Sequence, residues 1–152
     1  MNQVLFYFLV YVQFIHPNSE RIIGKWDLIS SGTIESIKNS DGYLLSDLKT
    51  QTLANEMFQV ALDSVFYEFK KDTLIYQDVA VPEGQMPVKT ITRKAIWTLH
   101  GDTLMVKELE RNYFRTYVVN TVGKDSLSLY PIIDNKANFK GGYTFIRVSI
   151  NK

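Results

Sequence analysis

The sequence contains no cysteine, which excludes disulfide bonds, thiol nucleophiles and every metal site built on thiolate ligands. Its two histidines, His16 and His100, are far apart in the chain, so a histidine-rich metal site or a Ser-His-Asp triad has little material. Neither sign of charge dominates, because 17 Lys and Arg face 16 Asp and Glu. We therefore expect no catalytic residues, no metal, no cofactor and, without a basic stripe, no nucleic-acid partner.

Aromatic and other apolar residues are well represented. The 152 residues, of which 45% are apolar, suffice for one globular domain with one hydrophobic core. Nine Phe, nine Tyr and two Trp favour β-structure. Binding cavities use the same residue types, so the aromatic content does not name a function.

The longest apolar run lies at the N-terminus, from Val4 to Ile15. It is shorter than the roughly 20 residues that a membrane-spanning helix needs, and it is typical of the core of a secretory signal. No Lys or Arg precedes it, and no cysteine follows it for lipid attachment. We interpret residues 1–18 as a signal segment and 19–152 as the folded domain, which predicts export to the periplasm or cell surface and no membrane span in the mature chain. The alternative is a first β-strand or a buried N-terminal segment.

From Gly24 onward, short apolar-rich segments are separated by turn residues. Such spacing, about 8 to 12 residues from turn to turn, favours an all-β sandwich or barrel. Eight consecutive antiparallel strands can close into an up-and-down barrel whose interior is filled or holds one small ligand. The expected strands are Lys25–Glu35, Ser64–Lys70, Thr73–Val79, Thr90–Leu99, Thr103–Leu109, Tyr113–Thr121, Ser126–Ile132 and Tyr143–Ile150.

One segment, Asp47–Leu62, has the period of a helix and falls between the first and second expected strands. Ser46 or Asp47 is suited to cap its start. We expect this short helix either to plug one end of the barrel or to form a mobile lid over a ligand portal. Its apolar face is made of Leu53, Met57, Val60 and Ala61.

Two motifs at opposite ends of the strand series carry a family resemblance. Gly24-Lys25-Trp26 opens the first strand, and Arg147 lies in the last. Together with eight strands, they resemble the G-x-W motif and the terminal Arg of lipocalins. The segments Ile96–Leu104 and Tyr143–Arg147 are similar to bacterial lipocalin-like domains. The resemblance implies an eight-stranded barrel whose Trp sits at the closed end with the Arg packed across it, a structural role for Gly24, Trp26 and Arg147.

The chain also departs from the lipocalin pattern. The T-D-Y motif is absent, and Arg115-Thr116-Tyr117 stands roughly in its place. The helix falls between the first two strands, whereas lipocalins carry theirs after the barrel. These departures bear on the transport function of that family more than on its fold.

Period-two alternation identifies a candidate ligand site. If the relevant faces of the fourth and sixth strands point inward, Arg115-x-Tyr117 resembles the carboxylate-gripping pair of fatty-acid-binding proteins. In the opposite phase, Arg115 points to solvent, and Phe114 and Val118 fill the core. The candidate ligand-binding residues are Arg93, Trp97, Tyr113, Arg115 and Tyr117.

Three functions remain open at this point. The first is a non-enzymatic cell-envelope protein that binds a small apolar or amphipathic ligand, including a carboxylate-bearing one, in its barrel. The second is a structural or interaction module with a filled barrel. The third is an enzyme on the same scaffold, for which no nucleophile–base pair is visible. An internal cavity of about 300 Å³ or more favours the first, and a packed interior favours the second.

Overall fold

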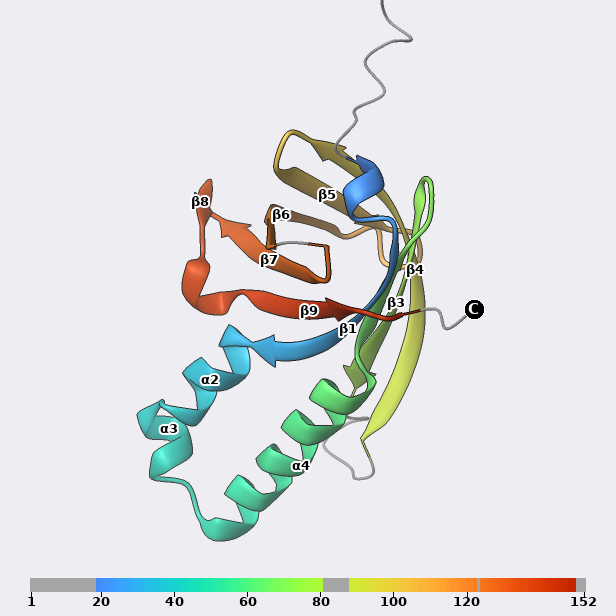
Figure 1. Cartoon of the computed structure of the whole chain (residues 1–152). Helices are drawn as coiled ribbons and strands as arrows, with labels where there is room; N and C mark the ends of the chain where they lie inside the picture. The colour runs from blue at the N-terminus through green and yellow to red at the C-terminus, as the bar shows by residue number, and fades with distance from the viewer. Residues whose placement is uncertain (1–18, 81–87, 123, 150–152) are drawn as a thin grey trace, which may run out of the picture.

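The computed structural model describes residues 19–80, 88–122 and 124–149. Figure 1 shows strongly curved strands wrapped around a common interior, with a helical arm projecting from one end. The segment 1–18, which we interpret as a signal, lies outside the described residues.

Within the described ranges, eight antiparallel strands close into an up-and-down barrel. Each strand pairs with its neighbour in the chain, β1 pairs with both β2 and β9, and the β6–β7 and β7–β9 pairings complete the ring. The predicted barrel is therefore confirmed. The strands are β1 Gly24–Ser31, β2 Phe66–Phe69, β3 Thr73–Ala80, β4 Lys89–His100, β5 Thr103–Glu108, β6 Phe114–Val122, β7 Ser126–Ile133 and β9 Tyr143–Arg147, and a short β8, Lys136–Ala137, pairs with the end of β7.

The predicted helix is present as α4 (Leu48–Ser64), and the side chain of Asp47 caps it by accepting from the Thr50 amide at 2.9 Å. The sequence predicted one helix between the first two strands, and the structure has more. In the described part of the chain two more short helices, α2 (Gly32–Lys38) and α3 (Asp41–Leu44), precede α4. Together the three form the arm seen in Figure 1.

The first strand was expected to continue to Glu35, which is wrong. It ends at Ser31, whose side chain accepts from the Ile34 amide and so caps α2. A serine hydroxyl that satisfies a free amide stabilises a helix start, and here it outweighs the β-propensity of the neighbouring Thr33 and Ile34. In the described ranges, two 3₁₀ turns accompany these helices and strands, η1 (Ser19–Arg21) and η3 (Phe139–Gly141).

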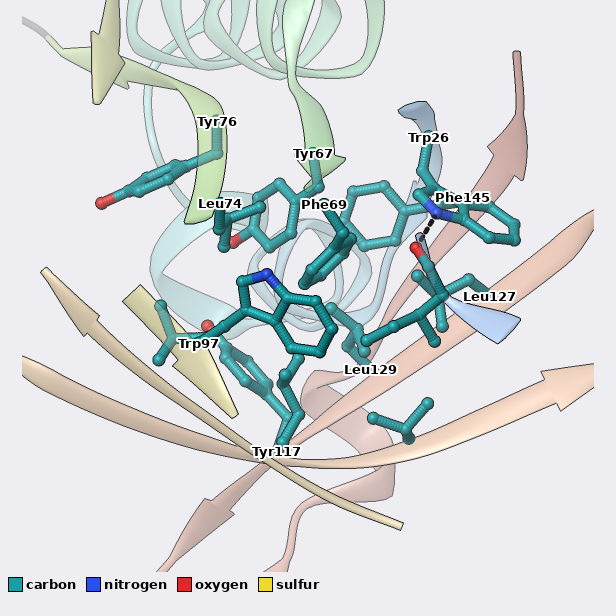
Figure 2. Packing of buried hydrophobic residues seen from close by; sticks show 14 of the residues in the cluster. Trp26, Tyr67, Phe69, Leu74, Tyr76, Trp97, Tyr117, Leu127, Leu129 and Phe145 are labelled. Carbon is teal, nitrogen blue, oxygen red and sulfur yellow. Dashed lines mark hydrogen bonds between the residues drawn. The ribbon is translucent and has the colours of Figure 1, made fainter. Parts of the chain in front are cut away.

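The interior contains a cluster of buried aromatic side chains, drawn in Figure 2. Trp97 meets Phe69 edge-on, with ring centroids 5.3 Å apart, and Tyr67 lies 4.9 Å from Phe145. Such pairs add about 0.5–1.5 kcal/mol each beyond the burial of their surface. The cluster therefore fills much of the barrel with protein side chains.

The barrel has two different ends. At the closed end β1 begins, β9 finishes and η1 lies against the strands, whereas at the open end β1 passes into α2 and β6 and β9 begin. At the closed end Trp26 pairs with Arg147 across β1 and β9, and the guanidinium carbon lies 4.1 Å from the centre of the Trp26 ring. The predicted contact between these residues is thus present.

Arg147 is held by backbone oxygens rather than by a carboxylate. Its Nε donates to the Lys124 carbonyl, Nη1 to Ile23 and Nη2 to Arg21, each at 2.9 Å. Gly24 has a φ of +130°, and a Cβ there would lie 2.8 Å from Arg147 Nη1. The glycine therefore makes room for the arginine, in agreement with the structural role that the resemblance implies.

Candidate functional site

The alternation of exposed and buried residues settles which faces of β4 and β6 point inward. On β4, the buried residues Ala95, Trp97 and Leu99 alternate with exposed ones. On β6, Tyr117 is buried and Arg115 half-buried, whereas Phe114 is 63% exposed. The phase in which Phe114 fills the core is therefore wrong, and the face that carries Arg115 points into the barrel.

Two adjoining cavities lie at the open end. The larger, about 370 Å³, is bounded by β6, the end of β7, η3 and the start of β9. The smaller, about 200 Å³, is bounded by β1, α2, the C-terminal end of α4 and β3. Thr33, Arg115 and Tyr143 line both cavities. Arg115 therefore stands at their boundary.

The structure brings three of the five candidate ligand-binding residues to the larger cavity. Tyr113, at 55% exposure, lies on its rim, and Arg115 and Tyr117 lie further in. Trp97 is instead part of the buried cluster, and its indole N–H donates to the Lys70 carbonyl at 2.9 Å. Neither Trp97 nor Arg93 lines either cavity. We therefore assign Trp97 a packing role.

A buried carboxylate organises the arginines at the open end. Glu108 is only 1% exposed, and Arg111 grips it through two nitrogens, Nε to Oε2 at 2.6 Å and Nη2 to Oε1 at 2.9 Å. Arg115 Nη2 donates to the same Oε1 at 2.7 Å. Such charge-assisted, two-pronged contacts are among the strongest polar interactions in proteins.

A second set of ion pairs surrounds this one. Arg93 lies 3.5 Å from an oxygen of Asp78 and 3.3 Å from one of Glu110. Arg111 reaches Asp78 at 3.8 Å. Among the described residues, this network joins three guanidinium groups to three carboxylates, those of Glu108, Asp78 and Glu110, so the charges within the network balance.

Glu108 is the residue that sequence reasoning missed. It was included only as a member of the expected strand Thr103–Leu109, because charged residues are mostly found at the surface. A signal was available, since Glu108 shares the period-two face of Leu104 and Val106, both of which are buried. A charge on the apolar face of a strand indicates a buried ion pair.

The site's acidic and phenolic groups have displaced pKa values. Burial raises the pKa of Glu108, but hydrogen bonding from Arg111, the closeness of the Tyr76 hydroxyl and the charge of Arg115 outweigh burial and hold that pKa below its usual value. Burial, reinforced by the nearby Glu108 carboxylate, raises the pKa of Tyr76 to about 12. Burial also raises the pKa of Tyr67 well above its usual value. At neutral pH the carboxylate is ionised and both phenols are protonated.

Two buried polar atoms beside the smaller cavity have no hydrogen-bond partner among the described residues, the Tyr76 hydroxyl and Arg115 Nε. The Arg115 guanidinium lies over the Tyr76 ring, 4.9 Å from its centre. Figure 2 shows the Tyr76 hydroxyl directed away from Tyr67 and Phe69. Glu108 is near enough to raise the pKa of Tyr76, yet no hydrogen bond of ordinary geometry joins them. The site thus retains unused hydrogen-bonding capacity.

In the part of the chain that the structure describes, no cluster of three or more His, Asp or Glu side chains is placed to hold a metal ion. No helix there is long and apolar enough to cross a membrane.

Comparison with known proteins gives structural neighbours only. No family model and no curated protein matches the sequence. A crystal structure of a lipocalin-like protein from Bacteroides uniformis is similar over 85% of this chain and 99% of its own, with 17% identity and a TM-score of 0.47. An uncharacterized protein from Bacteroides eggerthii is similar over 83% and 98%, with 14% identity and a TM-score of 0.45.

The barrel fold follows from the strand order and closure described above. With identities of 17% and 14% and TM-scores of 0.47 and 0.45, these two neighbours say nothing about the function of this chain. Membership of the lipocalin family stays a prediction from Gly24, Trp26 and Arg147.

Proposed function

We propose that this protein is a non-enzymatic, lipocalin-like binding protein that takes a small amphipathic molecule at the open end of its barrel. The observation that carries the proposal is the pair of adjoining cavities with the Arg115 guanidinium at their boundary. Aromatic side chains such as Tyr117 and Tyr143 line the larger cavity, which is typical of sites that bury the apolar part of a ligand.

The filled interior determines the depth of this site. Trp97, Phe69 and Trp26 occupy the closed half of the barrel, as the strand register places them, and are each no more than 4% exposed. A ligand therefore binds above this cluster, near α2 and the start of β6, rather than within the closed half of the barrel.

A cavity-blocking substitution tests the proposal. Thr33 is exposed and lines both cavities, so Thr33→Trp places a large ring over them with little cost to the fold. We expect wild-type protein to enhance the fluorescence of the uncharged probe N-phenyl-1-naphthylamine, and Thr33→Trp to weaken probe binding at least about tenfold, a change of about 1.4 kcal/mol.

The matched control is Thr98→Trp, which adds the same ring to an exposed threonine of β4 that lines neither cavity. It should bind the probe as the wild type does. Equal loss in both variants, or no probe binding by the wild type, would contradict ligand binding at the open end.

Export is part of the proposal. The apolar run Val4–Ile15 supports a signal segment that is removed before the domain reaches the periplasm or the cell surface. N-terminal sequencing of protein recovered from the native cell envelope tests this, with a first residue near Ser19 expected. A mature chain beginning at Met1 would contradict it.

A second candidate function, an interaction module, is favoured by a different observation. Leu44, Leu45 and Leu48 at the tip of the arm are 58%, 85% and 79% exposed. Exposed apolar clusters of this kind mark surfaces that bind other molecules. The probe experiment separates the two functions, because an interaction module with a filled barrel would not bind the probe at the open end.

A further inference from the structure

We infer that the polar head of the ligand is uncharged and both accepts and donates a hydrogen bond, as an alcohol does, rather than being a carboxylate. This inference rests on the proposed function and names the class of ligand for the same site. It departs from the sequence-based expectation of a carboxylate gripped by Arg115 and Tyr117.

The first reason is that Arg115 already has a carboxylate partner. Its Nη2 lies 2.7 Å from Glu108 Oε1, and Glu108 is buried on the adjacent strand. A ligand carboxylate must compete with a group held permanently in place by the chain. If it succeeded, Glu108 would lose one of its two guanidinium partners in a buried position, which is costly.

The second reason is the balance of charge at the open end. The charges of Glu108 and of Asp78, which lines the smaller cavity, oppose the approach of a second carboxylate. The guanidinium groups of Arg93, Arg111 and Arg115 oppose an ammonium group in the same way. A charged head would also lose its hydration without gaining an unpaired counter-charge, whereas an uncharged head loses far less.

The third reason is the pair of unpartnered atoms. Tyr76 is 1% exposed, and its hydroxyl has no hydrogen-bond partner among the described residues, nor has Arg115 Nε. Arg115 Nε–H donates only, and the protonated phenol of Tyr76 has lone pairs that accept. An alcohol oxygen satisfies both atoms, because it accepts from Arg115 and donates to Tyr76. A carboxylate could also accept from both atoms, because the phenol O–H donates as well. It is kept from this position by the charges of Glu108 and Asp78 rather than by a lack of hydrogen bonds.

The walls of the smaller cavity suit an alkyl chain next to such a head. They come from β1, α2, the end of α4, β3 and β9. Their apolar members are Leu28, Ile34, Ala61, Val65, Val79 and Phe145.

Three ligands with one tail and different heads test the inference: decan-1-ol, decanoate and decylamine. Their displacement of N-phenyl-1-naphthylamine is measured at pH 7 on the domain 19–152 and on the full chain. We expect decan-1-ol to displace the probe at a concentration about tenfold lower than either charged ligand, the ratio that 1.4 kcal/mol produces.

Two variants locate the head. Tyr76→Phe removes only the unpartnered hydroxyl, and should weaken decan-1-ol about tenfold while leaving decanoate unchanged. The control is Tyr130→Phe, because Tyr130 packs against Phe139 and lines neither cavity. Glu108→Gln frees Arg115 of its carboxylate, and should reverse the preference so that decanoate binds more tightly than decan-1-ol.

The outcomes separate the inference from the function on which it rests. If neither the probe nor any decyl ligand binds, the proposed function fails. If wild-type protein prefers decanoate or decylamine, the function stands and the inference is overturned. If decan-1-ol is preferred but Tyr76→Phe binds it as tightly as wild type, the assignment of the head to Tyr76 and Arg115 is wrong. Should Glu108→Gln fail to fold, the Tyr76→Phe result decides alone.

Discussion

Each end of the barrel carries an arginine over an aromatic ring, and the two pairs differ in what else holds the guanidinium. At the closed end, Arg147 lies 4.1 Å from the centre of the Trp26 ring and donates to three backbone carbonyls. At the open end, Arg115 lies 4.9 Å from the centre of the Tyr76 ring, donates to the Glu108 carboxylate and leaves Nε without a partner among the described residues. The same kind of contact, an arginine over an aromatic ring, therefore occurs once with the guanidinium fully hydrogen-bonded and once with a nitrogen left over.

The difference in hydrogen-bond partners suggests that Arg147 serves the fold and Arg115 serves ligand binding. The carbonyls that hold Arg147 belong to main chain in η1, just before β1 and in the turn between β6 and β7, so its partners do not depend on side-chain rotamers. Glu108 is a side chain, and the cavities of about 370 and 200 Å³ lie beside Arg115. Polar groups satisfied within the chain stabilise the fold, whereas those left unsatisfied beside a cavity are available to a ligand.

The largest effect on stability is expected at the closed end. Trp26 is 1% exposed, so Trp26→Ala should cost about 3–5 kcal/mol of the free energy of unfolding. Arg147→Ala should cost less, and most of its effect should vanish when Trp26 is already absent, because contacting residues are coupled. Urea denaturation of the two single variants and the double variant measures this. Strictly additive losses would show that the pair is not coupled.

Next comes the buried carboxylate of the open end. Glu108→Gln removes the charge that faces Arg111 and Arg115, and should cost about 2 kcal/mol at pH 7, within the usual range for charged hydrogen bonds. The partner guanidinium groups keep some contact with solvent, at 47% and 24% side-chain exposure, which limits the loss.

The cost of Glu108→Gln should also depend on pH. The pKa of Glu108 is lower in the folded than in the unfolded chain, so its stabilising effect is full above the unfolded value and is lost as the pH falls through the folded value. Urea denaturation of both proteins at pH 7 and pH 3 should show the gap narrowing at the lower pH. A gap that stayed constant or widened would contradict the assigned ion pairs.

An effect of similar size is expected at Gly24. Gly24→Ala imposes a side chain at a φ of +130° and 2.8 Å from Arg147 Nη1, and should cost about 1–3 kcal/mol. Gly101 provides a matched comparison, since its φ is also positive, at +60°, but a Cβ there meets no atom within 4 Å. Gly101→Ala should therefore cost less. Equal melting temperatures for the two variants would indicate that crowding against Arg147 is unimportant.

The strand pattern and the closed end were predictable from sequence because they depend on local alternation and on a motif at each end of the chain. The inward face of β6 was not, because Phe114 is the more apolar residue and yet is 63% exposed, whereas Arg115 faces inward. Hydrophobicity alone selects the wrong face there. The half-buried position of Arg115 is stabilised by Glu108 on the neighbouring strand, a partner that becomes visible only when β5 and β6 are paired.

The smallest effect on stability, and the sharpest test of the comparison, is expected from Tyr76→Phe. Removing a polar group that has a buried partner normally costs about 0.5–1.5 kcal/mol, but removing one without a partner costs nothing and relieves its desolvation. The Tyr76 hydroxyl is buried and unpartnered among the described residues, so Tyr76→Phe should leave the free energy of unfolding within about 0.5 kcal/mol of the wild type or raise it. Urea denaturation without added ligand measures this. A loss of 1 kcal/mol or more would mean that the hydroxyl has a partner in solution, and of the Arg115–Tyr76 pair only Arg115 Nε would then remain without one.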